Sequence, residues 1–285
     1  MPHFEGRSVI VTGAARGIGR AHALFFAAEG AHVVVNDLDS SASPDGGGES
    51  AEAVVEEITR AGGIAFANHD DVSTWSGAER LVEAAVREFG DLDILINNAG
   101  ILRDRMLYNM TEDEWDTVLQ VDLKGHFCPL RHAAAHWRRE AQQGRSKPRA
   151  VINTSSTSGL FGNAGQTNYG AAKMGVAALT IIAADELKRY DVRVNAIAPA
   201  AATRLTFDLA VLPEPGDVSP FVAYLASERC SITGRVFFVT GGSIHLFQPW
   251  AIVDKIETSQ RWTLEQLEEA AARFADVDFD LGIPF

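Results

Sequence analysis

Residues 8–19, SVIVTGAARGIG, join a short run of β-branched residues to a glycine-rich turn, and a helical pattern begins at Gly19. Glycines here permit a tight turn and let backbone N–H groups approach a pyrophosphate at the helix N-terminus, where the helix dipole favours negative charge. A glycine-rich turn alone is a weak signal, but its place between a first strand and a helix strengthens it. The stretch therefore predicts the first βα unit of a dinucleotide-binding fold.

Strand-like and helix-like segments alternate along most of the chain. The strand-like segments are short and rich in β-branched residues, and they lie at 8–11, 32–36, 64–67, 94–96, 150–153, 193–197 and 236–239. Helical patterns separate them, for example at 19–29, 51–61 and 78–89. Because near-continuous apolar strands interleaved with helices indicate a parallel sheet covered on both faces, we predict a doubly wound α/β fold.

The turn and the end of the second strand supply candidate cofactor contacts. Gly13, Gly17 and Gly19 leave room for a pyrophosphate, and Arg16 could serve a phosphate. Asp37 follows the second strand, where a carboxylate accepts both hydroxyls of an adenosine ribose and repels a 2′-phosphate. We therefore predict NAD rather than NADP, the alternative for Asp37 being a solvated acid after a strand.

The third and fourth strands also end in candidate contacts. Asp70, Asp71 and Val72 follow the third strand, and one carboxylate there could contact the adenine amino group; we favour Asp71. The tetrapeptide at 97–100, NNAG, ends the fourth strand at the edge where ligands of such folds bind. Its small residues, Ala99 and Gly100, leave space for a cofactor, and its asparagine amides can tie neighbouring strand ends together.

Residues 154–173, TSSTSGLFGNAGQTNYGAAK, contain the candidate catalytic groups. Tyr169 and Lys173 are at i and i+4, which places phenol and ammonium on one helix face. A free phenol titrates near pH ~10, and a nearby cation favours its ionised form, so we expect Lys173 to lower the pKa of Tyr169. Ser156 could hydrogen-bond a substrate oxygen. Alone, a tyrosine–lysine pair at this spacing is common by chance, so its context must decide.

Composition excludes several classes of function. The net charge is −13, which argues against nucleic-acid binding and against an anionic membrane surface. No apolar run is long enough to cross a membrane, and we predict a cytoplasmic protein. Cys128 and Cys230 are expected to be buried thiols in a reducing compartment. The histidines form no metal-like cluster, and we interpret His132 and His136 as surface or interface residues.

Taken together, these motifs resemble the short-chain dehydrogenase/reductase family. The T-G-x-x-x-G-I-G turn, N-N-A-G, a serine thirteen positions before Y-x-x-x-K, and Pro199 followed by Thr203 occur in order over about residues 5–245. The resemblance implies a seven-stranded parallel sheet, a nicotinamide cofactor and a homotetramer or homodimer. Backbone at Ile18 and Asn97 would line the cofactor, and Thr203 would contact its carboxamide.

The resemblance also implies roles for the catalytic groups. Tyr169, as phenolate, would take the proton of a hydroxyl while hydride leaves for the nicotinamide. Lys173 would lower the pKa of Tyr169 and hold the nicotinamide ribose, and Ser156 would orient the oxygen. The family usually has an asparagine where this chain has Asp122, so Asp122 is a candidate relay participant, with an N-terminal cap or a buried paired acid as the alternatives.

A narrower resemblance concerns the substrate. The segments at 34–38, 97–107, 162–173 and 195–204 are similar to the (3R)-hydroxyacyl-CoA dehydrogenase domain of peroxisomal multifunctional enzyme type 2, also called 17β-hydroxysteroid dehydrogenase type 4, and to bacterial single-domain relatives. This resemblance implies oxidation of a hydrophobic secondary alcohol carried as a CoA thioester. The alternatives are a 17β-hydroxysteroid dehydrogenase, a 3-oxoacyl carrier-protein reductase, which Asp37 disfavours, and an inactive dinucleotide-binding protein.

The sequence predicts two regions. Residues 1–247 form the dinucleotide-binding dehydrogenase domain, and residues 248–285 form a C-terminal extension with an acidic helix at 264–274. We expect the extension either to pack on its own domain or a neighbouring subunit, or to cap the fold. The polar stretch between 38 and 50 is expected to be an exposed loop inserted before the next helix.

Overall fold

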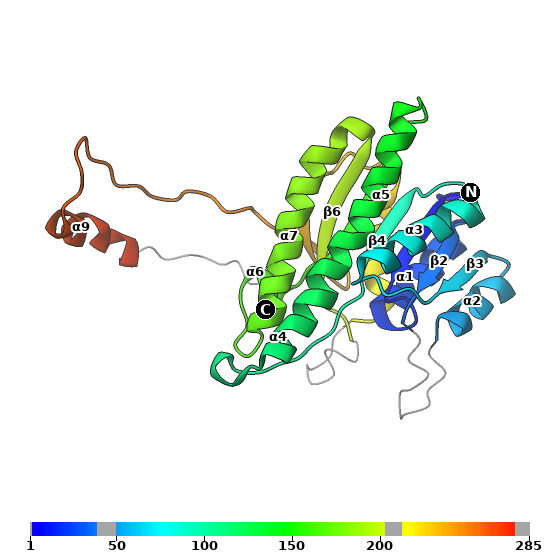
Figure 1. Cartoon of the computed structure of the whole chain (residues 1–285), viewed down its shortest axis with the longest axis horizontal. Helices are drawn as coiled ribbons and strands as arrows, with labels where there is room; N and C mark the ends of the chain where they lie inside the picture. Colours follow the sequence, from blue (N-terminus) through cyan, green and yellow to red (C-terminus); the bar gives the residue numbers. More distant parts are fainter. Residues whose placement is uncertain (1, 39–49, 203–212, 277–285) are drawn as a thin grey trace. The chain divides into compact units, whose positions relative to one another are not determined.

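One sheet organises the chain up to Leu246 in the computed structural model, which describes residues 2–38, 50–202 and 213–276 (Figure 1). Within those residues the strands are β1 (Ser8–Thr12), β2 (His32–Asn36), β3 (Ile64–Asn68), β4 (Ile94–Asn97), β5 (Arg149–Thr154), β6 (Val192–Pro199), β7 (Val236–Thr240) and β8 (Ser243–Leu246). They form one sheet in the order β3-β2-β1-β4-β5-β6-β7-β8. All pairs from β3 to β7 are parallel, which confirms the predicted doubly wound α/β fold.

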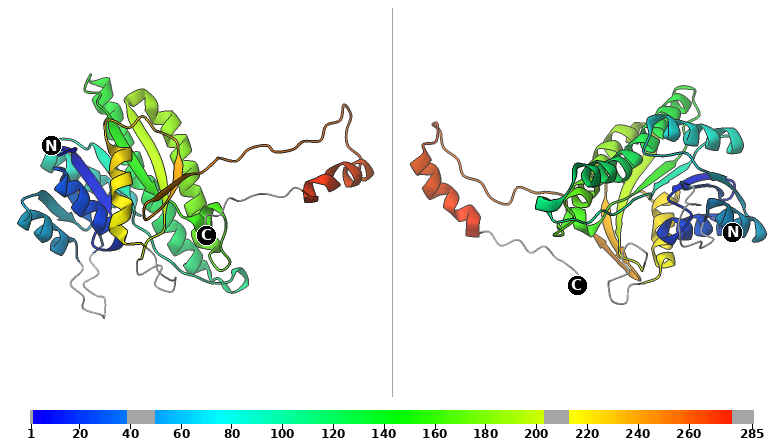
Figure 2. Two further views of the ribbon diagram at one scale, coloured as in Figure 1. Left: turned by 180° about the vertical axis from the view of Figure 1, so that it is seen from behind. Right: turned by 60° about the horizontal axis from the view of Figure 1, so that its bottom comes forward.

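Helices cover both faces of this sheet (Figures 1 and 2). The helices are α1 (Gly17–Ala28), α2 (Ala51–Arg60), α3 (Trp75–Phe89), α4 (Glu112–Val118), α5 (Gly125–Gln142), α6 (Thr157–Leu160), α7 (Thr167–Leu187), α8 (Ser219–Ala226) and α9 (Leu264–Ala271). Of these, α1, α2 and α8 pack on one face, and α3, α5 and α7 pack on the other. The strand order reverses between β1 and β4, and ligands of such sheets bind outside the carboxyl ends of the strands at that point.

The strands are apolar because both of their faces are buried. In β1, Val9 and Val11 belong to the core under α1 and α8, and Ile10 between them belongs to the core under α3 and α5. Each has no exposed surface. Full burial of such a side chain stabilises the fold by about 1.5–3 kcal/mol, so the central strands anchor both layers.

The sheet of the described residues has eight strands, one more than the seven that were predicted. β8 pairs antiparallel with β7, after a two-residue turn in which Gly241 has φ 50°. Every residue of β8 is exposed. Its sequence, SIHL, alternates polar and apolar residues, but four residues are the shortest run in which alternation indicates a strand, and neither face is buried.

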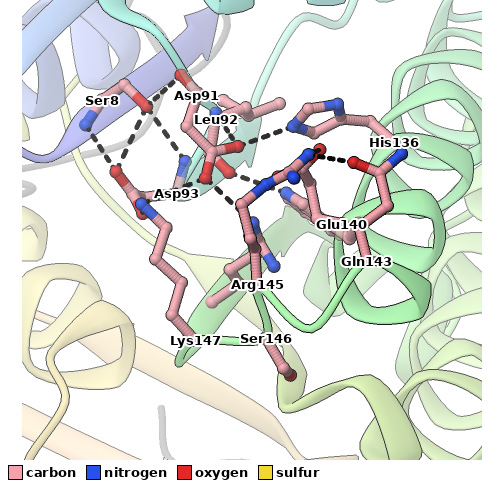
Figure 3. A network of polar contacts seen from close by, with 12 residues as sticks. Ser8, Asp91, Leu92, Asp93, His136, Glu140, Gln143, Arg145, Ser146 and Lys147 are labelled. Atoms are coloured by element: carbon pink, nitrogen blue, oxygen red, sulfur yellow. Dashed lines mark hydrogen bonds and ion pairs between the residues drawn. The ribbon is translucent and has the colours of Figure 1, made fainter.

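A polar network joins elements at the amino ends of the central strands (Figure 3). Asp91 Oδ1 lies 2.6 Å from His136 Nε2 on α5, and Asp91 Oδ2 accepts a 2.9 Å hydrogen bond from Arg149 Nη2 on β5. Asp93 Oδ2 accepts a 3.0 Å bond from the backbone of Ser8 on β1. His136 is therefore buried and paired, so its interpretation as a surface residue is wrong.

His132 is also buried, with 6% of its surface exposed, and its ring lies edge-on to Trp75 at 4.7 Å. Its interpretation as a surface residue is likewise wrong, because its place on α5 faces α3. Cys128 and Cys230 are free and buried, as predicted.

The chain divides into two compact units, Met1–Leu246 and Phe247–Phe285. In the second unit, α9 begins with a capping box in which Thr263 and Gln266 exchange side-chain to backbone bonds. A 3₁₀ turn, Ala272–Asp276, continues the helix, which agrees with the helical pattern at 264–274. The predicted loop insertion at 39–49 lies outside the described residues. None of the described helices has both the length and the apolar character needed to cross a membrane.

Candidate active site

The glycine-rich turn lies at the carboxyl end of β1, next to the end of β4. Gly13 and Gly17 adopt φ values of 64° and 52°, which only glycine tolerates without strain. A Cβ at Gly13 would lie 2.8 Å from Ala99 Cα, and a Cβ at Gly19 would lie 2.1 Å from the Gly13 carbonyl oxygen. Glycine is therefore required at these positions, and α1 begins at Gly17 with its first backbone N–H groups at the sheet edge.

Side chains tie the strand ends around this turn. Thr12 Oγ1 accepts hydrogen bonds from the backbone N–H groups of Asn98 and Ala99, at 2.9 and 3.0 Å. The Asn98 amide donates back to the Thr12 carbonyl at 3.0 Å. Asn97 donates to Asn153 Oδ1 on β5 at 2.9 Å. The expected tie between neighbouring strand ends is thus present, across β1, β4 and β5.

Asp37 lies beside the glycine-rich turn. Its Oδ2 accepts a 2.9 Å hydrogen bond from the backbone of Ala15, which holds the carboxylate at the end of β2. Arg16 occupies the N-cap position of α1 in an extended conformation. Both residues are therefore at the predicted binding edge, and their contacts to a cofactor stay predictions.

The two acids after β3 differ in their surroundings. Both oxygens of Asp70 accept hydrogen bonds, one of them from Arg80 at 2.6 Å. Asp71 uses Oδ1 for the backbone and the hydroxyl of Ser73, at 2.9 and 2.7 Å. Val72 next to it is buried. Since Asp70 is engaged through both oxygens, the contacts favour Asp71 as the adenine ligand.

Ser156, Tyr169 and Lys173 come from three neighbouring points at the ends of β5 and α7. Ser156 is the N-cap of α6, and its Oγ accepts a 3.2 Å bond from Ser158 N. Lys173 is 2% exposed; its Nζ donates to the Thr154 carbonyl at 3.0 Å and lies 5.5 Å from the centre of the Tyr169 ring. Serine, phenol and ammonium therefore meet at the carboxyl edge of the sheet.

Lys173 acts on the pKa of Tyr169 in the predicted direction, but burial acts against it and is the larger effect. Burial raises this pKa above its ordinary value of 10.0, and the charge of Asp122 adds to the increase. The charge of Lys173 and a hydrogen bond with Ser156 act to lower the pKa, as expected, but they do not outweigh burial. The lowering effect of Lys173 is therefore the expected one, and the net direction is upward because desolvation disfavours the phenolate.

Asp122 is a buried, paired acid. It lies in a π-helical turn, Leu119–Lys124, between α4 and α5. Its Oδ1 accepts a 2.8 Å bond from Ile101 N, and its Oδ2 is 3.3 Å from Lys173 Nζ. Burial raises the pKa of Asp122, and the charge of Lys173 opposes this increase. Of the two alternatives to a relay role, the buried paired acid is the one that the structure shows.

Two further residues complete the predicted set. Pro199 ends β6 at the same edge of the sheet. Thr203 lies outside the described residues. Lys173 and the backbone N–H groups of the glycine-rich turn are donors, and the carboxylate of Asp37 is an acceptor, which fits the needs of a nicotinamide dinucleotide. The glycines at 13 and 19 let the turn pack closely against α1 and the end of β4.

Sequence reasoning missed Asn168, directly before Tyr169. Its side chain is fully buried and donates to the carbonyls of Arg103 and Glu114, at 3.0 and 2.9 Å, while its Oδ1 accepts from Tyr169 N at 2.8 Å. Asn168 thus ties α7 to the loop after β4. An asparagine inside the first turn of a predicted apolar helix was the available signal, because such a residue is uncommon there without a partner.

Fold and site together define a nicotinamide-dependent dehydrogenase of the doubly wound class. The short chain dehydrogenase family matches residues 7–207. A hydroxyacyl-CoA dehydrogenase of Mycobacterium tuberculosis is 44% identical over 264 residues, 86% of this chain and 81% of that protein. Mouse peroxisomal multifunctional enzyme type 2 is 43% identical over 85% of this chain, which spans 32% of the mouse enzyme. A crystal structure of a short chain dehydrogenase from Mycobacterium avium is 49% identical, with a TM-score of 0.88 and 96% of each chain covered.

The chain belongs to the short-chain dehydrogenase/reductase family and is related to the dehydrogenase domain of peroxisomal multifunctional enzyme type 2. It is an oxidoreductase that acts on CH–OH groups with a nicotinamide dinucleotide cofactor. This finding replaces the alternative of an inactive dinucleotide-binding protein. When bound, the cofactor supplies the hydride acceptor or donor.

Proposed function

We propose that the protein oxidises (3R)-hydroxyacyl-CoA thioesters to 3-oxoacyl-CoA thioesters with NAD. The observation that carries the proposal is the meeting of Ser156, Tyr169 and Lys173 beside the glycine-rich turn. Similarity to a hydroxyacyl-CoA dehydrogenase over 86% of the chain supports this substrate class. The Asp37 carboxylate beside the turn supports NAD, because it would repel a 2′-phosphate.

The residues divide the chemistry between them. Ser156 hydrogen-bonds the substrate oxygen and orients it. Tyr169, as phenolate, takes the hydroxyl proton as the C–H bond gives up its hydride, so the alcohol becomes a ketone by losing one hydride to the nicotinamide and one proton to Tyr169. Lys173 holds its charge near the phenolate that forms. Positioning of this kind supplies much of the rate enhancement, because the reacting atoms are held in a near-attack arrangement.

The test compares substrates at matched concentration. NADH formation at 340 nm would be followed with (3R)-hydroxyacyl-CoA, (3S)-hydroxyacyl-CoA and estradiol, and we expect the 3R thioester to give the highest kcat/KM. Tyr169→Phe, which keeps the ring, should lower kcat by about 10²–10⁴-fold and leave NAD binding intact. A preference for estradiol would favour the 17β-hydroxysteroid alternative, and a preference for the 3S isomer would exclude the proposed substrate.

A further inference from the structure

Asp122 occupies a place that the chain has shaped for a carboxylate. Its side chain is fully buried, and a Cβ at residue 100 would lie 2.9 Å from Asp122 Oδ2 and 3.4 Å from Lys173 Nζ. Gly100 therefore makes room for the acid and the ammonium together. The bond from Ile101 N to Oδ1, at 2.8 Å, fixes the carboxylate with Oδ2 towards Lys173.

The ammonium of Lys173 lies near both the Asp122 carboxylate and the Tyr169 phenol. Its ammonium donates to the Thr154 carbonyl, forms the 3.3 Å ion pair with Asp122 and lies 5.5 Å from the centre of the Tyr169 ring. A cation near a phenol favours the phenolate, but an anion beside that cation offsets its field. Because both charged groups are almost without solvent contact, water screens this competition little.

Other ionisable groups around the pair are few in the described part of the chain. His126 on α5 is 1% exposed, and burial, followed by the charge of Lys173, holds its pKa well below its usual value, so it stays neutral. Asp104, in the loop after β4, acts on Tyr169 in the same direction as Asp122 but more weakly, and it accepts a bond from Gln166 at 2.9 Å. Lys124, on the same turn as Asp122, is exposed and directed to Gln120.

We propose that Asp122 is the counter-ion of Lys173 and that it holds back ionisation of Tyr169, so the enzyme abstracts the alcohol proton at a higher pH than it would with a neutral amide at position 122. Asp122 is thus a positioning residue that acts through Lys173. The proposal rests on the proposed role of Tyr169 as the acid/base. It goes beyond the family pattern, because an asparagine at this position carries no charge.

A purely structural role predicts something different. If Asp122 only accepted the Ile101 bond and tied the π-helical turn to that residue, an asparagine of the same shape would keep that bond through its own Oδ1. Asp122→Asn would then leave the pH profile in place. The two interpretations therefore separate on the pH dependence of the reaction rather than on its rate at one pH.

The experiment measures kcat/KM against pH for wild type and Asp122→Asn in both directions of the reaction. We expect the acid limb of alcohol oxidation and the alkaline limb of ketone reduction both to move to lower pH by about one unit, roughly tenfold in rate on the acid limb of oxidation. Asp104→Asn is the matched control, since it removes a carboxylate that does not touch Lys173, and it should shift the limbs much less.

A readout without substrate separates this proposal from the substrate assignment. Phenolate absorbance near 295 nm would be titrated in the NAD complex of wild type and Asp122→Asn, each against its Tyr169→Phe counterpart, so that Tyr169 alone is reported. An earlier phenolate titration in Asp122→Asn supports the proposal even if hydroxyacyl-CoA is not the substrate. An unchanged titration, or a shift to higher pH, would overturn it.

Discussion

At the residue scale, the behaviour of the reactive tyrosine depends on groups far from it in sequence. Tyr169 and Lys173 are one helical turn apart, but the pKa of the phenol is decided by burial first and by the opposed charges of Lys173 and Asp122 after it. Asp122 in turn reaches Lys173 only because residue 100 is glycine. A sequence pattern gives the spacing of the pair, whereas the field around it is a property of the folded site.

Asp37 is the single residue that we expect to set the choice between NAD and NADP. The bond from Ala15 N holds its carboxylate beside the glycine-rich turn, where we propose that it accepts the ribose hydroxyls. Asp37→Ser should lower the ratio of kcat/KM for NAD to that for NADP by about 10–100-fold, since hydrogen bonds to a charged group contribute about 1.5–3 kcal/mol. Steady-state kinetics with both cofactors measure this ratio. Asp70→Ser, on the next strand end, is the control, and an unchanged ratio in Asp37→Ser would contradict the assignment.

At the scale of elements, charged groups as well as apolar packing hold the amino ends of the strands (Figure 3). Arg149 on β5 has no exposed surface, and its guanidinium pairs with Asp91, which also binds His136 on α5. Burial acts to raise the pKa of Asp91, but hydrogen bonds from His136 and Leu92 and the charge of Arg149 hold it well below its usual value. One carboxylate thus connects β4, β5 and α5.

The contribution of this network is testable by chemical denaturation. Removing one partner of a buried ion pair costs about 3–5 kcal/mol, because the other charge is left buried. Asp91 is itself partly solvated, so we expect Asp91→Asn to lower the free energy of unfolding by an amount near the bottom of that range. Asp185→Asn breaks an exposed pair with Lys188 and should change stability by less than about 1 kcal/mol. If Asp91→Asn and Asp185→Asn lowered the free energy of unfolding equally, Arg149 would have to form an ion pair with another group when Asp91 is replaced.

At the scale of the whole molecule, the sequence predicts the buried strands and the positions of the site residues. It does not predict the exposed strand or the contacts between side chains from separate elements. Seven strands are read from apolar runs because both of their faces are covered, whereas β8 has only four residues and is exposed throughout. The site residues follow from spacing and from their positions at strand ends. The direction of the Tyr169 pKa and the pairing of His136 with Asp91 do not follow, because each depends on side chains brought together from separate elements.

His22 links that tertiary packing to the acid stability of the unit Met1–Leu246. It is fully buried on α1, where its Nδ1 lies 2.9 Å from Ser219 Oγ on α8, and burial lowers its pKa from 6.5 to about 3. The folded protein keeps this imidazole neutral, while the unfolded chain takes up a proton below pH 6.5. Stability from His22 is therefore complete above pH 6.5 and is lost as pH falls towards 3, by up to about 1.4 kcal/mol per unit.

His22→Asn isolates this effect, because asparagine cannot take up the proton and can still bond Ser219. Free energies of unfolding from denaturant titrations at pH 7, 6 and 5 should show the advantage of wild type over His22→Asn shrinking as pH falls. His245→Asn is the control, since it replaces a histidine on β8, where every residue is exposed. A constant difference in the free energy of unfolding between wild type and His22→Asn from pH 7 to 5 would contradict this prediction. It would mean that His22 is protonated as readily in the folded protein as in the unfolded chain, and that any loss of stability in acid comes from other groups.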